Sequence, residues 1–152
     1  MARATKRWIP NDKVLNDGMA KIKQIAEMAI VESLSKLAET SINYALDYKG
    51  YHNITYNLHD SYGYAIFHRG VEVKKWMNPP RAVKTDARGG FGADWGSIIL
   101  SEFDSTGDWQ LVVVAGEAYA EWHERFRIKY ADVLTHGYQY AEQHFLRDFK
   151  RI

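Results

Sequence analysis

Residues 14–48 form the segment that most limits how this chain can fold. They contain no proline and one early glycine, and apolar residues recur at steps of mostly three or four, which is the spacing of one buried face on an α-helix. Lys49 and Gly50 follow as a helix stop, with glycine in the left-handed cap position. At a rise of about 1.5 Å per residue, the pattern predicts a helix of about 50 Å. Since one small domain does not cover that length, we expect part of the helix to face a neighbouring subunit. The predicted buried stripe runs through Leu15, Met19, Ile22, Ala26, Ala29, Ile30, Leu34, Leu37, Ala38, Ala45 and Tyr48.

The first 13 residues read as an extended basic arm that Pro10 closes. The arm has no apolar core segment, so we expect no signal peptide. Its cations are candidates for contact with DNA or with an adjacent subunit, and the choice between these two is open. The cations are Arg3, Lys6 and Arg7, and the cap candidates for the helix that follows are Asn11, Asp12, Asn16 and Asp17.

The rest of the chain mixes strand and helix patterns. The predicted elements are strands at 61–68 and 71–77, a central strand at 109–115, and helices at 95–103 and 138–149. Arg69 and Gly70 suit a tight hairpin turn between the first two strands. This order predicts an α+β fold, in which the long N-terminal helix and a C-terminal helix pack on one face of a small antiparallel sheet. We assign residues 14–152 to a single domain, with a flexible loop rich in Pro and Gly at 78–94.

The composition excludes several classes of protein. Cysteine is absent, which excludes disulfides, thiolate metal sites and cysteine nucleophiles, and fits synthesis in a reducing cytosol. The formal net charge of +1 argues against a dedicated nucleic-acid binder. No apolar run approaches the length of about 18 residues that a membrane span needs. The aromatic fraction of 14% is high, and because aromatic side chains are enriched at interfaces, it favours a protein that assembles with others.

Charge is segregated along the chain. Residues 69–88 hold six Lys or Arg against two acids, whereas residues 93–124 hold seven acids and no Lys or Arg. These basic and acidic faces either meet between neighbouring copies of a head-to-tail ring or are both solvated. The charged candidates for such a contact are Arg81, Lys84 and Arg88 against Glu117, Glu121 and Glu124. The aromatic candidates for subunit or partner contacts are Trp8, Trp76, Phe91, Trp95, Tyr119 and Trp122.

No set of catalytic residues stands out. His123 and Glu124 begin an H-E-x-x-H zinc motif, but Arg127 occupies the second histidine position. Residues 89–92 are glycine-rich but lack the preceding strand and the Gly-Lys-Ser/Thr ending of a phosphate loop. A nucleophile elbow, G-x-S-x-G, is absent. We therefore expect no enzymatic activity, no metal and no cofactor.

Three stretches form a recognisable pattern. A long helix leads to a turn and strand of the type Thr-Gly-x-Leu-x-x-Ser, which here spans Thr55 to Tyr64 with Tyr56 in place of the usual glycine. A strand then ends in Val-Val-Ala-Gly-x-x-Tyr-Ala-x-x-x-Glu, which here spans Val113 to Glu124, and Tyr130 to Thr135 precede the closing helix. The pattern resembles the phage tail-completion or head–tail joining family of small neck proteins. Because a side chain disfavours positive φ, we expect no tight left-handed turn at Tyr56.

The resemblance implies a structural virion protein of a tailed phage. Copies would form a homo-oligomeric ring in the neck, which completes the DNA channel and joins portal-side, neck or tail proteins, with non-specific DNA contact in the channel left open. The implied location is the virion neck or tail, after synthesis in the cytoplasm of the host bacterium. The alternatives are a tail terminator or other tail adaptor protein, and a non-virion binding protein encoded by a phage.

Overall fold

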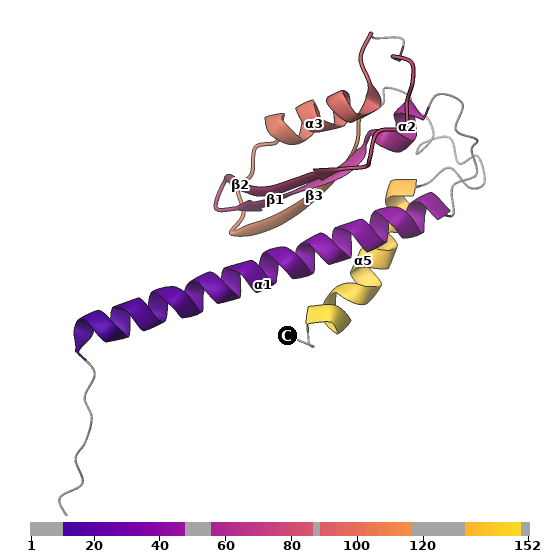
Figure 1. The fold of residues 1–152 in the computed structure, drawn as a ribbon. Coiled ribbons are helices and arrows are strands. Elements are labelled where there is room, and N and C mark those ends of the chain that lie inside the picture. The colour runs from indigo at the N-terminus through magenta and orange to yellow at the C-terminus, as the bar shows by residue number, and fades with distance from the viewer. Residues whose placement is uncertain (1–10, 48–55, 87–88, 117–132, 150–152) are drawn as a thin grey trace, which may run out of the picture. The chain divides into compact units, whose positions relative to one another are not determined.

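The computed structural model describes residues 11–47, 56–86, 89–116 and 133–149. In chain order the elements are α1 (Asp12–Asp47), α2 (Asn57–Asp60), β1 (Tyr62–His68), β2 (Val71–Met77), α3 (Gly92–Glu102), β3 (Trp109–Ala115) and α5 (Val133–Phe149) (Figure 1). The chain divides into two compact units, residues 1–30 and 31–152, so that α1 contributes to both. The predicted α+β class is confirmed, with a long N-terminal helix, a C-terminal helix and a three-stranded antiparallel sheet.

The first half of α1 contains only exposed and half-buried residues. The helix begins at Asp12, two residues before the predicted start, and of the four cap candidates it is Asn11 whose Oδ1 accepts a hydrogen bond from the backbone N–H of Val14, at 2.9 Å. None of the described residues up to Ile30 is buried. The prediction of one buried stripe along the helix is therefore wrong for this half.

The second half of α1 supplies part of the core of the second unit. Its buried residues include Leu34, Leu37, Ala38, Ile42 and Ala45. Helix α5 packs against this half. The rings of Tyr44 and Tyr140 lie 4.8 Å apart, and a β-carbon on Gly137 would lie 3.3 Å from the carbonyl oxygen of Ser41. The absence of a side chain at position 137 thus allows the two helices to approach closely.

The sheet has the order β2-β1-β3, and both pairs of strands are antiparallel. The predicted hairpin turn is confirmed, because Arg69 and Gly70 both have positive φ, 51° and 81°, as a two-residue hairpin of type I′ requires. The prediction that 109–115 is the central strand is wrong. Strand β1 is central since its residues 62–67 are buried on both faces, whereas Val113 of β3 is 37% exposed.

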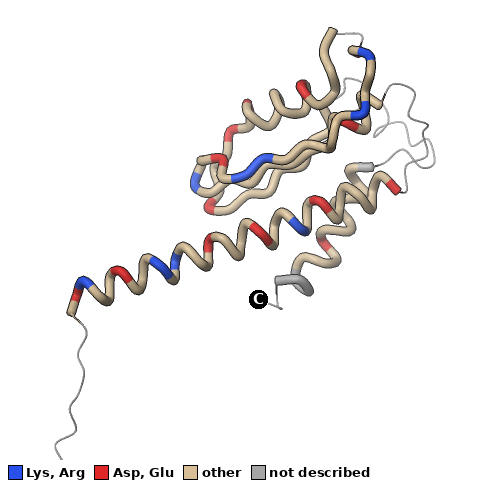
Figure 2. Tube along the Cα trace, viewed as in Figure 1, with Lys and Arg blue, Asp and Glu red and all other residues tan. Residues whose placement is uncertain are grey.

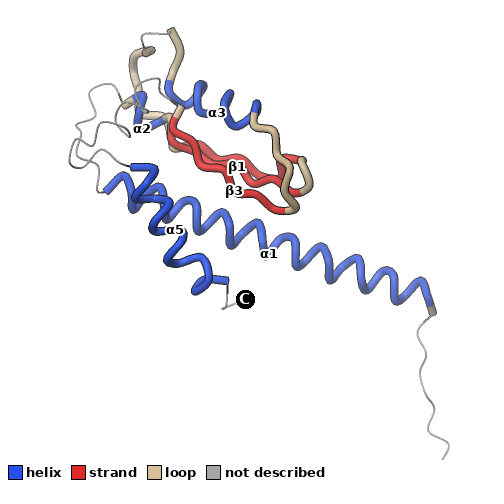
Figure 3. The backbone as a smooth tube through the Cα atoms, turned by 180° about the vertical axis from the view of Figure 1, so that it is seen from behind, coloured by secondary structure: helices blue, strands red, loops and turns tan. Residues whose placement is uncertain are grey.

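Helices cover both faces of β1. On one face Ala65 and Phe67 pack with Leu100 of α3. On the other face the hydroxyl of Tyr64 donates a hydrogen bond to Glu39 of α1 at 2.7 Å. Figures 1 and 3 accordingly show α3 on the opposite side of the sheet from residues 31–47 of α1. The expectation of helices on one face only is wrong, because successive strand residues point to opposite faces and both sets in β1 are apolar enough to need cover.

The contact between Tyr64 and Glu39 can be tested by removing one hydroxyl. Tyr64→Phe leaves the Glu39 carboxylate without this donor, so we expect the free energy of unfolding to fall by about 1 kcal/mol. Burial, with the hydrogen bond to Glu39 adding to it, raises the pKa of Tyr64 from 10.0 to about 12. The pKa of Tyr64 is therefore higher in the folded than in the unfolded state. The stability that depends on its protonated hydroxyl is present below pH 10.0 and is lost as pH rises toward 12.

Urea unfolding at a series of alkaline pH values measures this effect. The original protein should lose stability over that window, and the Tyr64→Phe variant should lose less. If both proteins lose stability in parallel, Tyr64 is not the group that titrates with folding.

Candidate functional site

Helix α2 is tied to the loop after β2 by a buried carboxylate. Asp60 is 1% exposed, and its Oδ2 accepts hydrogen bonds from the backbone N–H groups of Arg81 and Ala82, both at 2.6 Å. Its Oδ1 lies 3.0 Å from Nδ1 of His59. Hydrogen bonds to an ionised acceptor are stronger than neutral ones. The carboxylate therefore fixes the backbone from which the Arg81 side chain projects.

Two buried amides complete this connection. Asn57 accepts a hydrogen bond from the backbone N–H of Gly92 at 3.1 Å and donates one to the carbonyl of Lys84 at 2.9 Å. Asn78 donates to the carbonyl of His59 at 2.9 Å. We call Asn57, Asp60 and Asn78 the polar cluster. It holds the backbone of residues 81–84 and the start of α3 against α2.

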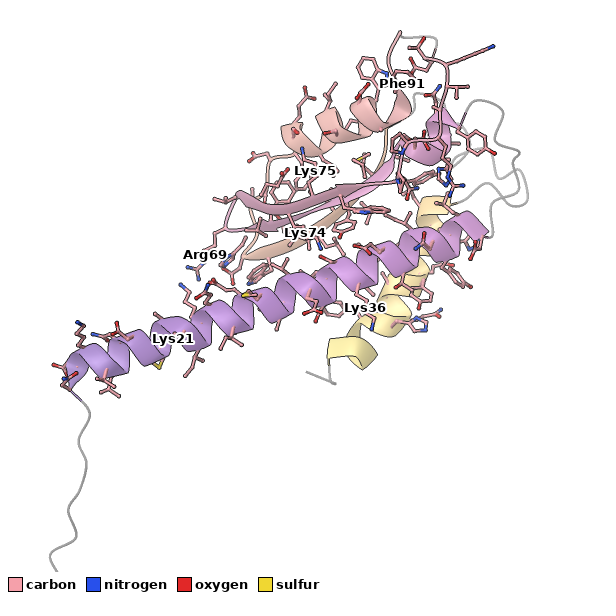
Figure 4. The ribbon with its side chains drawn as sticks, viewed as in Figure 1. Lys21, Lys36, Arg69, Lys74, Lys75 and Phe91 are labelled. Atoms are coloured by element: carbon pink, nitrogen blue, oxygen red, sulfur yellow. The ribbon has the colours of Figure 1, made fainter. Side chains whose placement is uncertain are left out.

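The polar cluster places three predicted contact residues in one region. Arg81 and Lys84 are exposed on the loop, and Phe91, at the N-cap of α3, is 40% exposed (Figure 4). Because the single side chain of Asn57 bonds both to Lys84 and to the residue after Phe91, these backbones lie close together. Helix α3 begins at Gly92, inside the range predicted as a flexible loop, and the flexibility of that loop stays a prediction.

The two predicted tryptophans that the structure describes are only partly accessible. Trp76 of β2 stacks on Tyr64, with ring centroids 5.6 Å apart and an interplanar angle of 24°. Trp95 of α3 lies against Gly90, where a β-carbon would be 2.8 Å from the indole nitrogen. Both side chains are thus engaged in packing within the domain, and each offers a partner only part of its surface.

Ten of the predicted contact residues lie outside the described residues. The acidic side of the predicted basic-to-acidic contact is among them, so that contact stays a prediction. The ten are Arg3, Lys6, Arg7, Trp8, Arg88, Glu117, Tyr119, Glu121, Trp122 and Glu124.

Two cations of the basic stretch make ion pairs within the chain. Arg69, at the hairpin turn, bonds through Nε to Oδ1 of Asp108 at 2.8 Å, and this hydrogen bond holds the pKa of the Asp108 carboxyl below its usual range. Lys75 lies 3.5 Å from Glu72. Figure 2 shows both signs of charge at the hairpin end of the sheet. Exposed pairs contribute little to stability. The Arg69–Asp108 pair nevertheless joins the basic and acidic segments within one molecule, an arrangement that differs from both sequence-based alternatives, a contact between copies and two solvated faces.

The first half of α1 carries an exposed apolar face, part of which the sequence assigned to one continuous buried stripe. We call it the N-terminal apolar face, and its six members are 49–67% exposed. They are Val14, Leu15, Met19, Ile22, Ile25 and Met28.

The phase of the helix explains why this face is not continuous with the buried face of residues 31–47. Each residue advances about 100° around the axis, so a step of four overshoots a full turn by about 40°. From Ile22 to Ala38 the predicted stripe takes four such steps, which add up to about 160°. Apolar side chains that start on one side of the helix therefore end on nearly the opposite side. If the angular position of each residue around the axis is followed, instead of only the step lengths, the two faces can be separated from sequence alone.

The part of the chain that the structure describes holds neither a metal-binding cluster nor a membrane-spanning helix. Within residues 11–47, 56–86, 89–116 and 133–149, no three acidic, His or Cys side chains are grouped so that they could hold a metal ion. Over the same ranges no helix has the length and apolar character that a membrane crossing requires. Comparison of the chain with protein-family models, with curated proteins and with solved structures finds no match.

Proposed function

We propose that this chain is a structural subunit of a tailed-phage particle and forms a ring in the head–tail connector, or neck. In this role it completes the channel through which DNA passes and joins neighbouring neck or tail proteins. The subunit works by binding its neighbours and carries out no reaction. The observation that carries the proposal is the backbone conformation of Tyr56.

Tyr56 lies in the left-handed region, with φ 63° and ψ −1°. The expectation that a tyrosine prevents a left-handed turn here is wrong. That region costs a residue with a side chain about 1–2 kcal/mol, so its surroundings must hold it. The carbonyl of Tyr56 accepts a hydrogen bond from the N–H of Asp60 at 2.9 Å, and its ring meets His59 edge-on at 6.2 Å. The position where neck proteins of the resembling family carry glycine thus has the conformation that glycine favours, which supports the proposal.

The second resembling stretch meets the first at one end of the sheet. Val113 and Val114 lie in β3 beside β1, and the N–H of Gly116 donates to the carbonyl of Ser61 at 3.2 Å. A β-carbon on Gly116 would come within 2.5 Å of Cα of Gly96, so the glycine of this pattern is required by packing. The two motifs therefore form one local structure, as parts of a single family pattern would.

The N-terminal apolar face supports an assembly role. Soluble monomers seldom leave contiguous apolar surface of this kind in water, and such patches mark interaction sites. In a ring, neighbouring subunits bury such patches.

Electron cryo-microscopy of intact phage particles tests the proposed function. We expect a ring of density in the neck into which the sheet with α3 and residues 31–47 of α1 fits. Particles from a phage with the reading frame disrupted should lack that ring and yield heads and tails that fail to join. A ring at the head-proximal end of the tail tube would instead identify a tail terminator. Complete absence of the chain from purified particles would leave a non-virion binding protein.

A further inference from the structure

The N-terminal apolar face has a size that calls for a partner. With its six residues 49–67% exposed, it presents apolar surface on the order of 500 Å², which is the size of the largest patch on a typical soluble monomer, and patches of that size are often functional. Lys21, labelled in Figure 4, belongs to the same stretch of α1, which lies in the first unit.

Gly18 indicates that the partner is a helix at close distance. It lies between Leu15 and Ile22, three and four residues away, and therefore on the same face. A β-carbon on Gly18 would meet none of the described residues within 4 Å, so the described part of the fold does not require glycine there. Glycine inside a helix costs about 1 kcal/mol relative to alanine. A missing side chain between two large ones allows another backbone to approach, and this explains the glycine.

The net charge of residues 12–30 favours a second copy of the chain as the partner of this face. Residues 12–30 hold three acids, Asp12, Asp17 and Glu27, and three bases, Lys13, Lys21 and Lys23, so their charges sum to zero. Figure 2 shows the two signs interspersed along this stretch. Anionic lipid surfaces and nucleic acids select basic helices. A neutral helix with interspersed charges is compatible with a second copy of itself, because no net repulsion opposes the pairing.

We propose that the N-terminal apolar face packs against the same face of a second copy, so that the first halves of two α1 helices form an intermolecular pair. The inference rests on the proposed function, since it names one contact through which copies assemble. Two such faces bury on the order of 1,000 Å², the lower limit for a specific interface. Same-face pairing is isologous and needs a two-fold axis between the two copies, so it adds to the head-to-tail contacts of a ring and is weak between isolated subunits.

Single-cysteine cross-linking tests this contact in the full-length chain. Because the chain has no cysteine, each substitution introduces a unique thiol. Ile22→Cys lies at the centre of the face. Ala20→Cys is the matched control, since two residues advance the helix by about 200° and place it on the opposite side. We expect oxidation to link Ile22→Cys copies several-fold more than Ala20→Cys copies across a concentration series that reaches the solubility limit. Equal amounts of covalent dimer at the two positions would overturn the proposal.

A second pair of variants tests the close approach at Gly18. Gly18→Leu and Ala20→Leu add similar apolar side chains two positions apart, so any general effect of hydrophobicity is common to both. By sedimentation velocity, Gly18→Leu should weaken self-association by about tenfold or more, and Ala20→Leu should leave it unchanged. Self-association that is unaffected by Gly18→Leu contradicts a helix partner at this position.

The same variants separate this inference from the proposed function. Particles that contain the ring but show no cross-link through Ile22→Cys would overturn the helix pair and leave the neck assignment intact. A chain that cross-links specifically through Ile22→Cys but is absent from particles would establish the helix pair and overturn the neck assignment.

Discussion

Gly116→Ala is expected to destabilise the second unit by about 3 kcal/mol, at the upper end of the usual cost of overpacking. The added β-carbon would overlap backbone atoms of Gly96 and come within 2.7 Å of the carbonyl carbon of Trp95. Backbone atoms inside a helix cannot move aside as a flexible side-chain tip can. The substitution must therefore displace the end of β3 or α3, and a shift of α3 uncovers Leu100, which is fully buried against the sheet.

Denaturant unfolding measures this cost, which should appear as a lower midpoint with an unchanged slope. Gly18→Ala is the matched control at protein concentrations too low for self-association, because a β-carbon there meets none of the described residues within 4 Å and alanine is the better helix former. We expect no loss of stability from the control. Equal midpoints for the two variants would mean that α3 and the end of β3 are not packed as closely as the structure describes.

The elements that could be predicted from sequence are those specified by local chemistry. Strands β1 and β2 follow from alternation and from an Arg-Gly pair that can adopt the two positive φ angles of the turn. The start of α1 follows from Asn11, whose side chain caps the first turn. In each case the signal and the structure that it specifies lie within a few residues of each other, so no knowledge of tertiary packing was needed.

The features that the sequence did not reveal depend on contacts between residues far apart in the chain, or on the gradual rotation of the apolar stripe around α1. The partners of Asp60 are backbone groups 21 and 22 residues further along the chain, and Asn57 reaches Gly92 across 35 residues. A backbone N–H looks the same at every position, so these residues read as an ordinary polar turn. The central place of β1 depends on which strand has both faces covered, and that is a property of the assembled layers.

Asp60→Ala is expected to lower the free energy of unfolding by about 3 kcal/mol, because two backbone N–H groups then lose their acceptor. Water can accept a hydrogen bond from part of these freed N–H groups, since the Arg81 side chain is exposed, and this limits the loss of stability. The larger effect should be local. Hydrogen exchange at the amides of Arg81 and Ala82 should accelerate far more than exchange in the centre of β1, because the carboxylate is what holds this backbone in place.

Two variants calibrate this result. Asp108→Ala removes an exposed carboxylate that pairs with Arg69 and should leave stability nearly unchanged. Asp60→Asn keeps an oxygen acceptor of the same size but removes the charge, and should fall between the original protein and Asp60→Ala. If Asp60→Ala destabilises the whole domain without a preferential rise in exchange at residues 81 and 82, the polar cluster supports the core in general. A preferential rise would show that the cluster positions the loop that presents Arg81 and Lys84, and would make those two cations the first to substitute in an assembly assay.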